Sequence, residues 1–249
     1  MQLNLYKYID KFCKNEYNGY SKKSGKGEKK MKSVYSLMLD DGVVAAIDRL
    51  AYLQNTNRSG LVNRILAEYA SYVTPEQRIR EAFGRISALL DGQDSFQPIM
   101  QPSDTMLSFR SALLYKYNPT VRYSVELFRT QVGEIGELRV SLRTQNNTLI
   151  AYMTYFYRLW TRIEETHLGA VDSRVADGKL VRRLTVRTTR RSSEASPSPE
   201  TIGDLIAAYI RVLDRALKAF FHLLDDPAAA AREIDGIYAA YLHSANLIV

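Results

Sequence analysis

The sequence predicts an α+β protein, because two hydrophobic periods follow one another along the chain. Apolar residues recur at helical spacing in residues 40–90 and 201–249, whereas residues 96–170 contain runs of β-branched and aromatic residues divided by Asn, Pro and Gly. Of the 249 residues 46% are hydrophobic, which is enough for a packed core. We expect an N-terminal dimerisation unit, then a small antiparallel sheet with a covering helix, and a C-terminal helical hairpin.

The dimerisation unit is predicted at residues 33–75. Loose alternation over residues 34–39 is typical of a short strand. Asp40 supplies the N-cap of a first helix and Asn57 that of a second, with Asn55 in the turn between them. A lone strand and two short helices cannot enclose a core, so we expect two copies to pair, their strands forming an antiparallel ribbon. The predicted dimer core comprises Tyr35, Leu37, Leu39, Ile47, Leu50, Val62, Ile65 and Leu66.

This unit resembles the ribbon-helix-helix DNA-binding proteins of the Arc, MetJ and CopG type. The resemblance rests on element lengths, caps and core positions in the sequence VYSLMLDDGVVAAIDRLAYLQNTNRSGLVNRILAEY, residues 34–69. A two-stranded ribbon fits the major groove of B-DNA. The resemblance therefore implies that the outward strand residues Val34, Ser36 and Met38 face the bases.

The resemblance also implies a phosphate site at the start of the second helix. The backbone amides of Asn57, Arg58 and Ser59 would hold a DNA phosphate there. This agrees with the physics of a helix N-terminus, which presents free N–H groups and the positive end of the helix dipole. The side chain of Arg58 would add a mobile positive charge.

The net charge of +7 lies mostly outside this unit. Residues 1–32 and residues 174–191 each carry +6, whereas residues 33–75 carry −1. Within residues 1–32, the lysines from Lys22 to Lys30 are interrupted by Ser and Gly, a composition typical of a disordered tail, and Met31 is an alternative translation start. Because Ser36 is the only hydrogen-bonding side chain among the base-facing residues, we expect the tail to supply affinity through DNA phosphates. The tail residues assigned to this contact are Lys29, Lys30 and Lys32.

The later parts of the chain are predicted from changes of period and from turn residues. They are a connecting helix at residues 76–95, an α+β domain at 96–170, a basic segment and linker at 171–200, and a helical hairpin at 201–249. Within the α+β domain we expect strands at 109–117, 121–129 and 137–143 and a helix at 148–166. Aromatic residues between Tyr152 and Trp160 recur at helical spacing and are expected in the core. The basic residues 174–191 predict an edge strand with its charges outward, and nucleic-acid contact there is an alternative.

Several classes of site are not expected. The single Cys13 excludes an intramolecular disulfide and a cysteine-based zinc site, and His167, His222 and His243 have no metal-ligand spacing. We expect no metal and no cofactor. No phosphate loop, nucleophile motif or paired carboxylates occur, so the sequence does not predict an enzyme. The apolar segment 149–160 is too short to span a bilayer, and no signal peptide precedes it, so we expect a cytoplasmic protein without membrane contact.

Together these features predict a homodimeric, sequence-reading DNA-binding protein that acts as a transcriptional regulator such as a repressor. Residues 96–249 would bind an effector or a protein partner. One alternative is an antitoxin, or a DNA-partition or relaxosome accessory protein, that binds a protein partner through its C-terminal region. A second is an interaction protein whose strand pairs with a different chain, and a third is an enzyme within residues 96–170.

Overall fold

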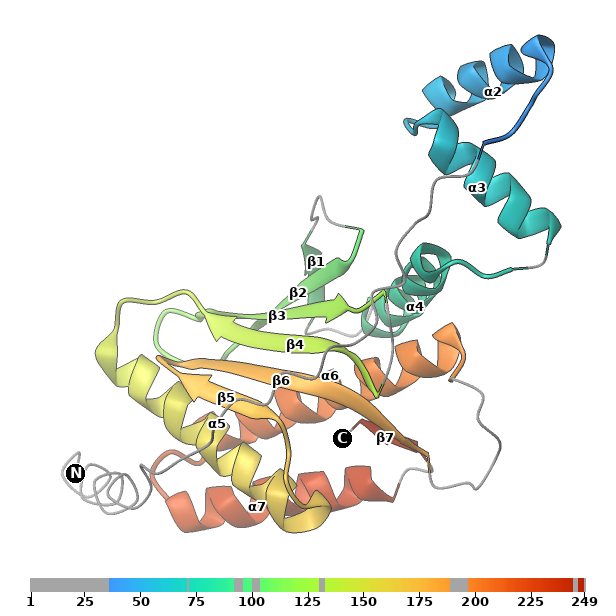
Figure 1. Cartoon of the computed structure of the whole chain (residues 1–249). Helices are drawn as coiled ribbons and strands as arrows, with labels where there is room; N and C mark the ends of the chain where they lie inside the picture. The colour runs from blue at the N-terminus through green and yellow to red at the C-terminus, as the bar shows by residue number, and fades with distance from the viewer. Residues whose placement is uncertain are drawn as a thin grey trace.

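Figure 1 shows the computed structural model of the chain, which combines helices with an antiparallel sheet. The structure describes residues 36–70, 72–91, 96–99, 104–129, 133–188, 197–243 and 246–248. The predicted α+β class is confirmed. Of the predicted N-terminal strand, Val34 and Tyr35 lie outside the described residues, as does the Lys-rich segment 1–32. Residues 36–40 form no regular element, so the strand predicted at 34–39 is not observed in its described part.

The first two helices, α2 (Asp41–Leu53) and α3 (Arg58–Tyr69), begin where the sequence predicts. Local side chains cap them: Asp40 and Asn57 each accept a hydrogen bond of 2.8 Å from a backbone amide of the first turn. Asn55 adopts a φ of 55° in the turn between the helices, a left-handed conformation that Asn tolerates well. The two predicted helices and the turn between them are therefore confirmed.

The sheet is antiparallel throughout. Its spatial order is β1 (Phe96–Ile99), β2 (Met106–Ala112), β3 (Thr120–Leu127), β4 (Glu134–Leu142), β6 (Lys179–Thr188) and β5 (Ser173–Ala176), and β7 (Asn246–Ile248) pairs with the end of β6. The three predicted strands are confirmed as β2, β3 and β4. The predicted range 109–117 extends too far, because Tyr117 and Asn118 take positive φ values of 66° and 43° in the turn after β2. Strands β1 and β7 are not among the predicted elements.

Strand β6 lies inside the sheet, which corrects the prediction of a basic edge strand. It pairs with β4 on one side and β5 on the other, so β5 forms the edge. The side chain of Lys179 is exposed, but that of Arg182 is buried, so the charges do not all face outward. The reason is a hairpin turn at Asp177 and Gly178, with φ values of 49° and 69°, which adds a further strand beside β6.

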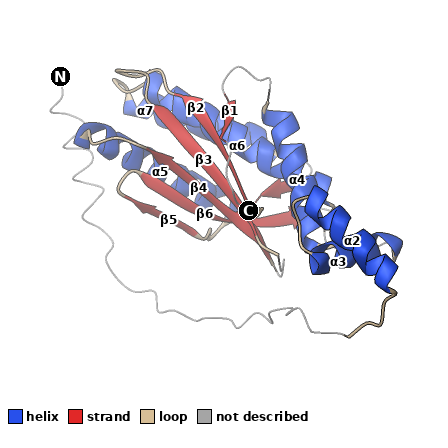
Figure 2. Cartoon of the chain, turned by 90° about the horizontal axis from the view of Figure 1, so that it is seen from above, coloured by secondary structure: helices blue, strands red, loops and turns tan. Residues whose placement is uncertain are grey.

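Three helices cover one face of the sheet (Figure 1): α5 (Asn147–Leu168), α6 (Pro199–His222) and α7 (Pro227–Leu242). The other face is turned toward the viewer in Figure 2, and no described helix crosses its middle. The predicted helix 148–166 is confirmed as α5, and the predicted hairpin as α6 and α7. However, residues 246–248 form a strand in place of the expected helical end. None of the described helices is long and apolar enough to cross a membrane.

Aromatic side chains fill the core between α5, α6 and α7, as predicted for the run that ends at Trp160. The Trp160 ring makes edge-on contacts with Tyr209 and Tyr238, at centroid distances of 6.2 and 5.1 Å. Phe156 and Tyr157 are also fully buried. These side chains are therefore packed against other elements and are not available as a surface for stacking bases.

Helix α4 (Pro75–Leu90) follows the N-terminal helices and belongs to the same core as the sheet. A helix is thus observed within the predicted range 76–95, but it ends at Leu90, and residues 92–95 lie outside the described residues. Its buried face packs on α6, where Gly203 permits close approach: a Cβ at this position would lie 2.7 Å from the Cβ of Arg85. An ion pair of 2.6 Å between Arg85 and Asp204 joins the two helices beside this contact.

Candidate nucleic-acid interface

The residues predicted to face DNA bases lie just before α2. Val34 lies outside the described residues, whereas Ser36 and Met38 are both exposed, and the Met38 side chain is fully so. Leu37 and Leu39, which alternate with them, are also exposed. Among the described residues the segment therefore has neither a buried nor a paired face, and both sets of side chains are exposed.

Helices α2 and α3 bury little of their own apolar surface. Ala51, Leu61 and Ala67 are the buried residues of this pair. The predicted dimer-core residues are more accessible: Leu50, Ile65 and Leu66 are exposed, Ile47 and Val62 are half-buried, and Tyr35 lies outside the described residues. The two helices thus present an apolar surface that the described residues leave uncovered. The members of the predicted dimer core that are exposed are Leu37, Leu39, Leu50, Ile65 and Leu66, and we call this set the open apolar face.

The start of α3 has the donors that an anion site needs. Asn57 caps the helix through its side-chain oxygen, which accepts a hydrogen bond from the backbone amide of Gly60. The amides of Arg58 and Ser59, at the first two helical positions, have no acceptor within the helix. Two backbone donors therefore remain for a phosphate at this end.

The side chain of Arg58 pairs with an acidic residue, whereas the sequence predicts an unpaired, mobile charge. Its Nε and Nη2 atoms donate to the two carboxylate oxygens of Asp48 on α2, at 2.7 and 2.5 Å. This hydrogen bonding lowers the pKa of the Asp48 carboxyl. It also raises the pKa of Arg58. The guanidinium thus tethers α3 to α2, and a phosphate would have to share it with Asp48 or displace that carboxylate. Lys29, Lys30 and Lys32 lie outside the described residues.

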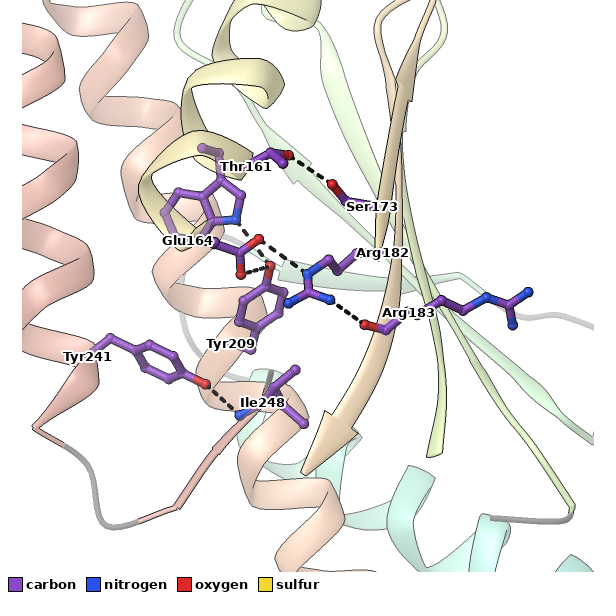
Figure 3. A network of polar contacts seen from close by, with 9 residues as sticks. Thr161, Glu164, Ser173, Arg182, Arg183, Tyr209, Tyr241 and Ile248 are labelled. Atoms are coloured by element: carbon purple, nitrogen blue, oxygen red, sulfur yellow. Dashed lines mark hydrogen bonds and ion pairs between the residues drawn. The ribbon is translucent and has the colours of Figure 1, made fainter. Parts of the chain in front are cut away.

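A polar cluster that the sequence reading missed lies between α5, α6 and β6 (Figure 3). Arg182 Nε donates to Glu164 Oε2 at 3.2 Å, and the Tyr209 hydroxyl donates to Glu164 Oε1 at 2.8 Å. The indole N–H of Trp160 donates to the same hydroxyl at 3.1 Å. Arg182 and Glu164 are 1% and 0% exposed. Burial raises the pKa of Glu164, and Arg182 and Tyr209 oppose the rise.

This buried cluster holds three elements together in the core. A substrate could not reach Glu164 or Arg182 without a rearrangement of the helices, because both side chains are enclosed. One sequence signal could have revealed the arrangement: Leu180, Arg182 and Leu184 occupy alternate positions of one strand, and the two leucines mark the inward face. A partner for the charge would then be expected on a covering helix.

Among the residues that the structure describes, no group of three or more His, Cys, Asp or Glu side chains could hold a metal ion. Nε2 of His167, one of the three histidines considered as ligands, lies 2.8 Å from an oxygen of Asp235. No protein-family model, curated protein or solved structure significantly matches the chain.

Proposed function

We propose that the chain is a homodimeric DNA-binding protein that acts as a transcriptional regulator, with the paired segments 34–39 forming a ribbon in the major groove. The observation that supports this most is the open apolar face beside a segment with no strand partner. Two copies related by a twofold axis would cover each other's apolar face and pair the two segments. Ser36 and Met38 would then lie on the outer face of the ribbon, and the free amides of α3 would hold flanking phosphates.

The energy available from the open apolar face is compatible with such a dimer. Full burial of one large apolar side chain contributes about 1.5–3 kcal/mol, so half of that for each of five side chains per protomer gives roughly 10 kcal/mol per dimer. Association itself costs about 4–15 kcal/mol. The hydrogen bonds of the ribbon would add to this balance of similar magnitudes, and we expect the dimer to weaken when the ribbon is disrupted.

Paired substitutions in the open apolar face test the proposal. Leu50→Asp with Leu66→Asp should convert the full-length protein from dimer to monomer in light scattering, and should abolish its shift of duplex DNA. Leu114→Asp is the matched control, since Leu114 is also an exposed leucine but lies in the turn after β2. A wild-type monomer that binds DNA, or a dimer that survives both substitutions, would contradict the proposal.

An effector or protein partner of residues 96–249 is the second part of the proposal. The sheet and its helices form a core of their own, which comprises none of the residues of α2 and α3. Helix α4 packs on α6 and directly follows the N-terminal helices, so ligand binding to residues 96–249 could change the position of α2 and α3 through α4. Comparison of DNA affinity in the presence and absence of cell metabolites would test for an effector.

A further inference from the structure

The open face of the sheet carries a row of positive charges from three different strands. The strand register places Arg110 of β2 opposite Arg122 of β3, and Arg122 opposite Ser141 of β4, which in turn lies opposite Lys179 of β6. Arg174 of β5 lies on the same face, one row further along. All four cationic side chains are exposed. We call Arg110, Arg122, Arg174 and Lys179 the basic sheet face.

No carboxylate among the described residues forms an ion pair with any side chain of the basic sheet face. The carboxylates of the open face lie in the neighbouring rows and are already engaged: Glu126 and Glu137 pair with Arg139 at 3.1 and 2.6 Å. Glu137 also pairs with Arg183 at 3.4 Å. The neutral Gln97 accepts a bond of 2.9 Å from Arg110. Within the part of the chain that the structure describes, the positive charge of the basic sheet face is therefore not balanced by a carboxylate.

Two features make this row unusual for a merely solvated surface. Like charges directly opposite on neighbouring strands repel each other, and Arg110 and Arg122 are such a pair. Basic residues often protect a sheet edge from aggregation, but β2, β3 and β6 all lie inside the sheet, between the edge strands β1 and β5. Edge protection therefore accounts for none of the charges on these three strands.

We propose that the basic sheet face binds the phosphate backbone of duplex DNA as a second contact, in addition to the ribbon. From Arg110 to Lys179 the row crosses three strand gaps, about 14 Å. A duplex presents roughly eight phosphates over such a length. Ser141 is a small side chain between Arg122 and Lys179, so a phosphate can approach both cations. The choice of DNA among polyanions rests on the proposed function.

The chemistry of the face favours a duplex over a single strand. Proteins that bind single strands stack bases on aromatic side chains. In the two rows that hold the basic sheet face, the other described residues are Gln97, Ile99, Ser108, Ser124, Arg139, Ser141, Ala176 and Val181, none of which is aromatic. The contact should therefore be independent of sequence and should depend steeply on salt.

The test compares two charge-matched variants of the full-length protein. Arg122→Gln with Lys179→Gln removes two cations from the basic sheet face. Arg215→Gln with Arg232→Gln removes two exposed cations from α6 and α7, on the helical side of the molecule. All four residues are exposed, so both variants should melt like the wild type. The readout is the dissociation constant for a random duplex between about 50 and 200 mM salt, by fluorescence anisotropy.

We expect Arg122→Gln with Lys179→Gln to weaken binding at least fivefold and to reduce the log–log salt slope by about 1.8 per bound protomer. Arg215→Gln with Arg232→Gln should keep the affinity and the salt slope of the wild type. Equal behaviour of the two variants would overturn the inference, and so would tighter binding of single strands or of duplex RNA. Combination with Leu50→Asp and Leu66→Asp separates the proposals. If removal of Arg122 and Lys179 still weakens DNA binding in the leucine variant, this inference holds even if the ribbon proposal fails. If only the leucine substitutions weaken DNA binding, the ribbon alone is supported.

Discussion

Replacement of Arg182 by leucine should destabilise the protein strongly, because it leaves the Glu164 carboxylate buried without its counter-ion. Both side chains are enclosed, at 1% and 0% exposure, and the pair is joined at 3.2 Å. Removal of one partner from such a pair costs about 3–5 kcal/mol. For a chain of this size that corresponds to roughly 6–20 °C in melting temperature. Chemical and thermal unfolding followed by circular dichroism would measure it.

The cost should depend on pH with a definite sign. Burial already raises the pKa of Glu164 above its ordinary value, and Arg182 opposes the rise, so the substitution raises this pKa further. An acid with a raised pKa in the folded state contributes stability that is complete below its unfolded pKa and is lost as the pH rises through the folded pKa. Arg182→Leu should therefore lose less stability in acid than at neutral pH.

The neighbouring Arg183 provides the control. It lies on the same strand but points to the opposite side (Figure 3), where it pairs with the exposed side chain of Glu134 and with the buried Glu137, which Arg139 also contacts. Because Glu137 keeps its ion pair with Arg139, Arg183→Leu should cost clearly less stability than Arg182→Leu. Glu164→Leu added to Arg182→Leu should restore most of the loss, because an apolar pair can replace a buried ion pair. Equal losses for the two arginines, or a loss independent of pH, would refute the reasoning.

Three other predictions follow from local contacts. Gly203→Val should separate α4 from α6 and lower the melting temperature, because even a Cβ would lie 2.7 Å from that of Arg85; Gly236→Val, with open space at its Cβ, should cost less. Asn57→Ala should cost about 1 kcal/mol of stability through loss of the α3 cap, measured by urea unfolding, whereas Asn57→Asp should keep it. Burial raises the pKa of Tyr241 to about 12, so ionisation should destabilise the fold progressively above about pH 10. Tyrosinate absorbance recorded with the unfolding midpoint would check this, and full ionisation near pH 10 in a folded protein would contradict it.

Local chemistry made the N-terminal helices and the central strands predictable from sequence. Asp40 and Asn57 cap α2 and α3 through contacts within one turn, so their position depends on few distant residues. Strand β1 was missed because it has four residues and contains Pro98, which is tolerated on an edge strand but weakens a sequence-based assignment. Strand β7 has only three residues, which provide too short a pattern.

Tertiary arrangement explains the remaining errors. The alternating pattern of β6 correctly indicates a strand, but its place between β4 and β5 depends on the path of the chain through α5. The same limit applies to the candidate sites. The basic sheet face joins Arg110 and Arg122 to Lys179, more than 50 positions later in the chain, through strand register alone. The ion pair of Arg58 with Asp48 likewise depends on how α3 folds back on α2.

Selection of bound duplexes from a random pool by the full-length protein tests the central claim most directly. A twofold dimer with a ribbon in the major groove should enrich a palindromic or nearly palindromic site, because the symmetry of the site mirrors that of the protein. The Leu50→Asp and Leu66→Asp variant, carried through the same selection, should enrich none. A pool that gains no common sequence, or one that gains a site without twofold symmetry, would contradict the account.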